Sequence, residues 1–307
     1  MDEIIRTEYL CKYFRNVKAV DGISISIEKG EIYGFLGLNG AGKTTTIRML
    51  LGMISPTTGA SYLNGKLVTG GNPDLWTNVG NLVEIPYSYP DLTVVENLDI
   101  IRRLRFIKKT TAVDEIITRL GLDPYRNVIA KNLSLGNSQR LGLAKALMHN
   151  PEILLLDEPA NGLDPAGIVE IREMLQDLAI NKGVTVFISS HILGEVSKFA
   201  TRIGIIHEGR LILESGVPDM EKLRKKSLHI RTLDLNGAKD LLEKKGYYPT
   251  LAEGNFLEIH NAEAMQKPES IATILVNSGF PPNMLMVEEE DLESFFLRVI
   301  SIKGGVE

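Results

Sequence analysis

Cysteine is almost absent from this sequence: Cys11 is the single one among 307 residues. One cysteine cannot form an internal disulfide, and it cannot supply the paired thiolates of a zinc site. The composition therefore excludes a disulfide scaffold and fits a reducing compartment such as the cytoplasm.

An excess of positive charge is also missing. The 34 Lys and Arg residues are outnumbered by 39 Asp and Glu, which leaves a formal net charge of -5 and a pI of about 5.7. A protein with this balance has no overall attraction for polyanions. We therefore expect no nucleic acid among its partners.

Long hydrophobic runs are lacking as well. Apolar stretches such as Ile153–Leu156 and Val184–Ile188 are far shorter than the roughly 20 residues that cross a bilayer. The chain opens on Met1-Asp2-Glu3, whereas a signal peptide opens on basic residues. Any membrane role is expected to come through a partner protein.

The order of expected elements predicts two unequal domains. In residues 1–217, strands that are apolar on both faces alternate with amphipathic helices, which is typical of an α/β protein with a mainly parallel sheet. A strand is expected at Ile23–Ile27 and a helix at Ser138–Met148. Residues 218–307 are predicted to form a small accessory α+β module with a ferredoxin-like βαββαβ order.

A phosphate-binding loop follows the first long apolar strand. Residues Gly37–Thr44 match G-x-x-x-x-G-K-S/T, and they lie between an expected strand and an expected helix, as this motif requires. Lys43 is predicted to reach the β- and γ-phosphates of ATP, and Thr44 to bind Mg²⁺. The nucleotide-binding candidates of this segment are Asn39, Gly40, Ala41, Gly42, Lys43, Thr44 and Thr45.

Two carboxylates come directly after the buried strand Ile153–Leu156. Ligands of α/β proteins bind at this end of the strands. Asp157 is therefore predicted to hold Mg²⁺, directly or through water, and Glu158 to polarise the attacking water. With the upstream loop, these residues indicate a P-loop NTPase.

The segment Leu133–Arg140 narrows the class. Its residues Leu-Ser-Leu-Gly-Asn resemble the Leu-Ser-Gly-Gly-Gln signature of ABC ATPases, with Leu135 and Asn137 as departures. The resemblance implies an ABC ATPase fold, in which a parallel core carries antiparallel β and helical subdomains. It also implies that Ser134 and Gly136 contact the γ-phosphate held by a second copy, so that ATP joins a homodimer.

Two further segments strengthen this resemblance. Asn161–Pro165 is similar to the D-loop at the family's dimer interface, which makes Asp164 a nucleotide-site candidate. His191, after Ser189 and Ser190, occupies the place of the family's switch histidine and is expected to contact the γ-phosphate. Near the N-terminus, Phe14 resembles the aromatic residue that stacks on adenine, with Val20 beside it; Tyr13 is an alternative stacking ring.

The segment Val79–Tyr87 occupies the place of the family's Q-loop but carries Glu84 instead of glutamine. Glu84 is expected to contact the membrane subunit on one side and Mg²⁺ or the attacking water on the other. With the residues that follow, the segment resembles bacitracin- and lantibiotic-type exporters.

The resemblance implies a peripheral ATPase on the inner face of the membrane, bound to an integral membrane permease. Exporters of other cargo share this kind of ATPase subunit, so export of another cargo is the alternative hypothesis. A soluble ABC ATPase of DNA maintenance is disfavoured because residues 43–134 contain no sustained heptads and no cysteines. A pure binding module, whose nucleotide site would not hydrolyse ATP, is disfavoured because all the expected motif residues are present.

Overall fold

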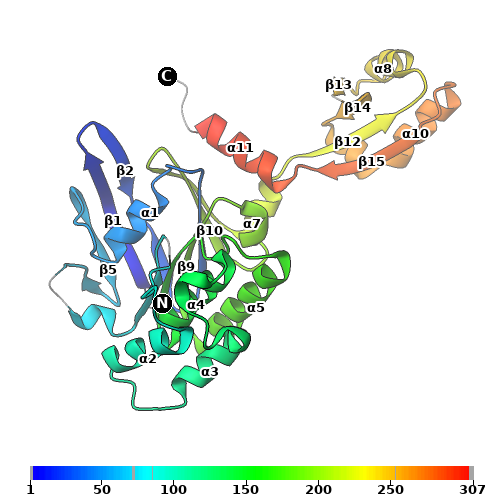
Figure 1. Cartoon of the computed structure of the whole chain (residues 1–307). Coiled ribbons are helices and arrows are strands. Elements are labelled where there is room, and N and C mark those ends of the chain that lie inside the picture. The colour runs from blue at the N-terminus through cyan, green and yellow to red at the C-terminus, as the bar shows by residue number, and fades with distance from the viewer. Residues whose placement is uncertain (1–2, 71–72, 85, 253, 304–307) are drawn as a thin grey trace. The chain divides into compact units, whose positions relative to one another are not determined.

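The computed structural model describes residues 3–70, 73–84, 86–252 and 254–303. They form two compact units, and Figure 1 labels many of their helices and strands. The first unit runs to Val217 and also includes the chain from Val299, and the second spans Pro218–Arg298.

The strands of the first unit are β1 (Glu3–Phe14), β2 (Val17–Ile23), β3 (Ser26–Glu28), β4 (Ile32–Leu36), β5 (Thr58–Leu63), β6 (Lys66–Leu67), β7 (Val79–Leu82), β8 (Ile153–Asp157), β9 (Thr185–Ser190), β10 (Arg202–His207) and β11 (Arg210–Gly216). Its helices are α1 (Lys43–Leu50), α2 (Val94–Leu104), α3 (Ala112–Arg119), α4 (Leu135–Leu147), α5 (Pro165–Lys182) and α6 (Leu193–Val196).

A six-stranded sheet in the order β11-β10-β4-β9-β8-β7 forms the centre of this unit. From β10 to β7 every neighbouring pair is parallel, and only β11 is antiparallel. Every residue of β4, β8 and β9 is buried. The side chains on one face share a core with helix α1 and with strands of a second sheet. Because these strands are buried on both faces, they read as continuous apolar runs. The α/β class predicted from the sequence is confirmed.

A second, antiparallel sheet has the order β2-β1-β5-β6, with β3 also paired to β1. The prediction of a single strand at Ile23–Ile27 is wrong, because β2 ends at Ile23 and β3 begins at Ser26. The hydroxyl of Thr7 donates to the carbonyl of Ile23 at 2.9 Å and accepts from the amide of Ile25 at 3.0 Å. One side chain thus replaces ladder bonds at the point where the strand was expected to continue.

An aromatic cluster joins neighbouring strands in the core of the first unit. The ring of Phe187 on β9 lies 5.7 Å from that of Tyr33 and 5.2 Å from that of Phe35, both on β4. All three side chains are fully buried. Burying a side chain of this size stabilises a fold by about 1.5–3 kcal/mol, so this cluster stabilises the β4–β9 pairing.

The second unit contains the strands β12 (Lys226–Arg231), β13 (Thr250–Ala252), β14 (Phe256–Ile259) and β15 (Met284–Glu289), and the helices α7 (Val217–Leu223), α8 (Leu235–Lys244), α9 (Ala262–Gln266), α10 (Pro268–Asn277) and α11 (Leu292–Lys303), of which the first and last extend into the first unit. Its antiparallel sheet has the order β13-β14-β12-β15. Alternate residues such as Leu228, Ile230, Leu257 and Ile259 form its core with the helices. This arrangement is consistent with a ferredoxin-like βαββαβ module.

The end of the second unit differs from the sequence-based boundary. The accessory module was expected to run to residue 307, whereas the compact unit ends at Arg298, inside helix α11. No glycine or proline interrupts α11, so its residues carry no local signal of a boundary.

The aromatic cluster gives a test of stability. Phe187→Ala should lower the free energy of unfolding by about 3–5 kcal/mol, since it removes a buried ring and leaves a cavity. Ile180→Ala, at a side chain 77% exposed on α5, should change it by less than about 0.5 kcal/mol. Urea unfolding of the first unit, followed by circular dichroism, measures both. Equal losses for the two variants would contradict the role of the cluster.

Candidate functional site: a phosphate loop facing two carboxylates

The phosphate loop connects the buried strand β4 to helix α1, which begins at Lys43. Gly42 has a φ of 110°, and a Cβ at this position would lie 2.4 Å from the carbonyl oxygen of Ala19. A Cβ on Gly37 would lie 2.5 Å from the carbonyl oxygen of Ile206. Both positions therefore require glycine. The free amides at the start of α1 face the loop, which makes this turn suited to phosphate.

Lys43 lies across the loop with a side chain only 6% exposed. Its ammonium group donates to the carbonyl of Gly37 at 2.6 Å and to that of Leu38 at 3.2 Å. It also lies 3.3 Å from a carboxylate oxygen of Glu158. A cation held over the loop is suited to neutralising the oxygens of a bound phosphate chain.

Thr44 and Asp157, the two residues predicted to bind Mg²⁺ at the end of the sheet, are in direct contact. The hydroxyl of Thr44 donates to Asp157 Oδ2 at 2.7 Å, and the hydroxyl of Ser189 donates to Asp157 Oδ1. Asp157 is buried. Carboxylate and hydroxyl oxygens are the donors that Mg²⁺ prefers, usually in combination with substrate phosphates and water. The residues present therefore fit a magnesium ion.

Glu158 lies next to this pair in a strained conformation. Its φ is 49°, a left-handed value that costs a non-glycine residue roughly 1–3 kcal/mol. Its carboxylate lies 2.9 Å from Nδ1 of His191, and its side chain is 18% exposed. Both residues proposed for catalysis thus lie together beside Lys43. A carboxylate so placed can accept a proton from water.

The signature and D-loop segments begin two helices. Ser134 caps α4, and its hydroxyl accepts from the amide of Asn137; Asp164 caps α5 and accepts from Gly167. The sequence predicted that this helix begins at Ser138. The cap formed by Ser134 explains why α4 begins earlier, at Leu135. A Cβ on Gly136 would lie 2.8 Å from the carbonyl oxygen of Gly162, so the two segments pack closely within one chain.

The aromatic candidates differ in their surroundings. Phe14 is 47% exposed, and the ammonium group of Lys12 lies 5.2 Å from its ring centre. The hydroxyl of Tyr13 donates to Asp21 at 2.7 Å, and this hydrogen bond raises the pKa of Tyr13. The proposed role of Val20 needs correction. Val20 is fully buried, and a Cβ on Gly42 would lie 3.4 Å from it, so Val20 supports the loop and leaves no surface for adenine.

Glu84 follows strand β7 and is not assembled with the metal candidates. It forms an ion pair with Arg48, and its side chain is 54% exposed. Arg48 follows Thr44 by four residues on α1, which puts it one turn, about 5.4 Å, further along that helix. The pairing with Arg48 directs Glu84 to this second turn, so the structure does not support it as a magnesium ligand.

Three polar residues had no role in the sequence-based predictions, and two of them, Ser189 and Gln139, contact Glu158. Ser189 bridges the carboxylate of Asp157 and the amide of Glu158, and Gln139 donates from α4 to the carbonyl of Glu158 at 3.1 Å. The ammonium group of Lys145 donates to the carbonyl of Tyr87 and to the Ser88 hydroxyl; burial lowers the pKa of Lys145 to about 8. Gln139 could have been identified from the sequence, because it is a polar residue within the buried face of a helix.

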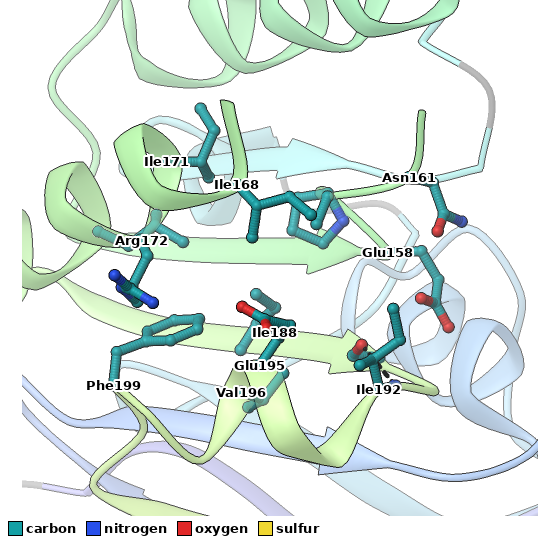
Figure 2. Close-up of a pocket in the computed structure, with 14 residues that line it drawn as sticks. Glu158, Asn161, Ile168, Ile171, Arg172, Ile188, Ile192, Glu195, Val196 and Phe199 are labelled. Carbon is teal, nitrogen blue, oxygen red and sulfur yellow. Dashed lines mark hydrogen bonds between the residues drawn. The ribbon is translucent and has the colours of Figure 1, made fainter. Parts of the chain in front are cut away.

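An apolar pocket adjoins the carboxylate end of the site (Figure 2). Glu158 and Asn161 lie at one end of it, and Arg172 and Phe199 at the other. Its walls come from α5, β9, α6 and the residues after α6, and they include Ile168, Ile171, Leu175, Ile188, Val196 and Phe199. This surface keeps the neighbourhood of the Glu158 turn largely apolar on one side.

Comparison with known proteins identifies the family. The family model described as "ABC transporter" matches residues 20–161. The bacitracin transport ATP-binding protein BcrA of Bacillus licheniformis is 38% identical over 316 residues, which cover 99% of each chain. The chain belongs to the ATP-binding proteins of ABC transporters. It is therefore an ATPase with the P-loop ABC fold.

Other relatives agree with this assignment. The BcrA protein of Enterococcus faecalis is 37% identical over 100% of this chain and 99% of its own. The lantibiotic transport ATP-binding protein SrtF of Streptococcus pyogenes is 35% identical over 72% of this chain and 94% of its own. A solved dimeric ATP-binding cassette bound to ADP and Pi superposes with a TM-score of 0.65 over 70% of this chain and 99% of its own, at 23% identity, and shows the shared fold.

The backbone of the phosphate loop provides a direct test. Gly42→Ala should lower the affinity for ATP at least tenfold, the order expected for strain of a few kcal/mol, because the added Cβ would meet the Ala19 carbonyl. Gly194→Ala, on α6 with open space around the glycine, should leave ATP binding unchanged. Titration with a fluorescent ATP analogue measures both. Unchanged binding by Gly42→Ala would show that the loop conformation is not needed.

Proposed function

We propose that this chain powers a separate membrane permease that exports a peptide antibiotic of the bacitracin or lantibiotic type. The observation that carries the proposal is the full-length similarity to bacitracin transport ATP-binding proteins, which includes the C-terminal unit. Among the described residues, no helix has both the length and the apolar character to cross a membrane. From its similarity to ATP-binding subunits of ABC transporters, the subunit is proposed to lie in the cytoplasm against the inner face of the membrane, bound through the permease.

The described geometry supports a division of roles within one nucleotide site. The phosphate loop and Lys43 bind the β- and γ-phosphates of ATP, and Thr44 and Asp157 hold Mg²⁺, which supplies charge neutralisation at the phosphates when bound. Glu158 accepts a proton from the attacking water. His191, in contact with Glu158, orients that carboxylate and contacts the γ-phosphate. Phe14 stacks on adenine through its exposed ring.

The remaining part of the site is proposed to come from a second copy of the chain. Ser134 and the amides that follow it begin helix α4, and free amides at a helix start bind anions. Leu135 beside them is 60% exposed. A partner nucleotide placed here would use the helix start and bury this apolar side chain. ATP would then join two chains, and hydrolysis would release them.

Three variants separate the steps of this cycle. Glu158→Gln should bind Mg·ATP but lose about a hundredfold or more in turnover, the scale of general-base removal, and should accumulate as a dimer. Lys43→Ala should lose ATP affinity and stay monomeric. Ser134→Phe should bind ATP as a monomer and fail to dimerise. Size-exclusion chromatography with light scattering, with and without ATP, distinguishes them. A Glu158→Gln protein that stays monomeric in excess ATP while the wild type turns over would contradict the two-chain site.

Glu84 is proposed to serve the coupling to the permease. Glu84→Gln keeps a hydrogen-bonding partner for Arg48 but removes the charge. ATPase activity of the isolated subunit should therefore stay within about twofold, since exposed ion pairs contribute little, while peptide resistance of cells that carry the whole transporter should change. Glu173→Gln, the same substitution on the exposed side of α5, is the control and should change neither. Equal effects of Glu84→Gln on both measurements would count against a coupling role.

The alternative is an exporter of other cargo. Cells that carry the chain and its permease would then show no change in the inhibitory concentration of bacitracin or of a lantibiotic, although the ATPase remained active. A soluble ABC ATPase would instead be isolated without any membrane protein.

A further inference from the structure

The main chain of Glu158 is held on both sides by buried polar side chains. Its amide lies 3.1 Å from the hydroxyl oxygen of Ser189 and 3.2 Å from the Ser189 carbonyl. Its carbonyl accepts a hydrogen bond of 3.1 Å from the side-chain amide of Gln139. Ser189 belongs to β9 and Gln139 to α4, so two separate elements restrain one peptide.

Burial makes these hydrogen bonds costly to lose. Ser189 is fully buried and Gln139 is 3% exposed. A buried amide or hydroxyl without a partner is strongly disfavoured, so these side chains are confined to the positions that satisfy them. Gln139 lies on the same helix that Ser134 caps, which gives it a rigid support.

The restraint matters because Glu158 has a left-handed φ of 49°. A non-glycine residue keeps such a conformation only where its surroundings enforce it. The direction of the carboxylate follows from the backbone angles, and in this conformation it reaches His191 at 2.9 Å and Lys43 at 3.3 Å. A relaxed peptide would direct the same carboxylate elsewhere.

We propose that Gln139 and Ser189 are positioning residues for ATP hydrolysis, which hold the strained peptide of Glu158 so that its carboxylate faces the attacking water. The proposal rests on the assignment of Glu158 as the general base. Gln139 acts only through the Glu158 carbonyl. Ser189 acts through the Glu158 amide and also orients the metal-binding carboxylate of Asp157.

Gln139→Met tests the first half of the restraint, since it keeps the length of the side chain and removes the donor. In the full-length protein, kcat should fall between about tenfold and a hundredfold, as misplacement of a catalytic group by about 1 Å does. The dissociation constant for ATP should stay within about twofold, because no phosphate contact is changed. Gln176→Met, the same substitution at a half-buried residue of α5, should leave kcat, ATP affinity and melting temperature unchanged.

A double-mutant cycle separates positioning from general damage to the fold. If Gln139 acts through Glu158, adding Gln139→Met to Glu158→Gln should change the residual single-turnover rate by less than about twofold, because groups that act as a unit are not additive. A further loss comparable to that of Gln139→Met alone would overturn the proposal. A matching loss of ATP affinity in Gln139→Met would overturn it as well.

Ser189 provides a second route if Gln139→Met does not fold. Ser189→Ala should lower kcat by a similar factor and raise the magnesium concentration needed for half-maximal rate, and Ser189→Thr, which keeps the hydroxyl, should restore both in part. Wild-type turnover in Ser189→Ala would overturn this half of the proposal. If Glu158→Gln itself keeps wild-type turnover, the base assignment fails, and that outcome is distinct from a failure of Gln139 or Ser189.

Discussion

Parallel pairing of β9 with β4 on one side and β8 on the other is the constraint on which the site depends. The register places Leu36 opposite Ser190, and Ser189 opposite Asp157. The residue after β4 begins the phosphate loop, the residue after β9 is His191, and the residue after β8 is Glu158. Because parallel strands end at the same edge of a sheet, this register brings the phosphate loop, the carboxylates of Asp157 and Glu158, and His191 to one edge. A slip of one residue would turn these side chains to the opposite face.

The buried aromatic cluster and the strained turn act on the same strands in different ways. Phe187 packs against Tyr33 and Phe35, which stabilises the pairing through the burial of apolar surface. At the end of β8, by contrast, Glu158 adopts a conformation that costs free energy, and polar side chains from β9 and α4 form hydrogen bonds with its main chain. The free energy gained by burying the aromatic cluster offsets the free-energy cost of the Glu158 conformation. This combination is expected where a carboxylate must keep one direction.

Similarity to other proteins divides along the two units. The solved cassette bound to ADP and Pi covers about the length of the first unit, whereas the bacitracin transport proteins match through the second unit as well. Among the curated relatives, the match to SrtF covers 72% of this chain, whereas the matches to the BcrA proteins extend over nearly all of it.

Local sequence determined the phosphate loop and the acidic pair after β8, because each depends on residues adjacent in the chain. The same residues predicted the α/β class through their apolar runs. Other features involve partners far apart in sequence, and only the tertiary structure decided them. Arg48 forms an ion pair with Glu84, and Val20 is buried beside Gly42. Gln139 and Ser189 form hydrogen bonds with the main chain of Glu158. Burial and long-range hydrogen bonds arise when the sheet and helices pack, so no local pattern could specify them.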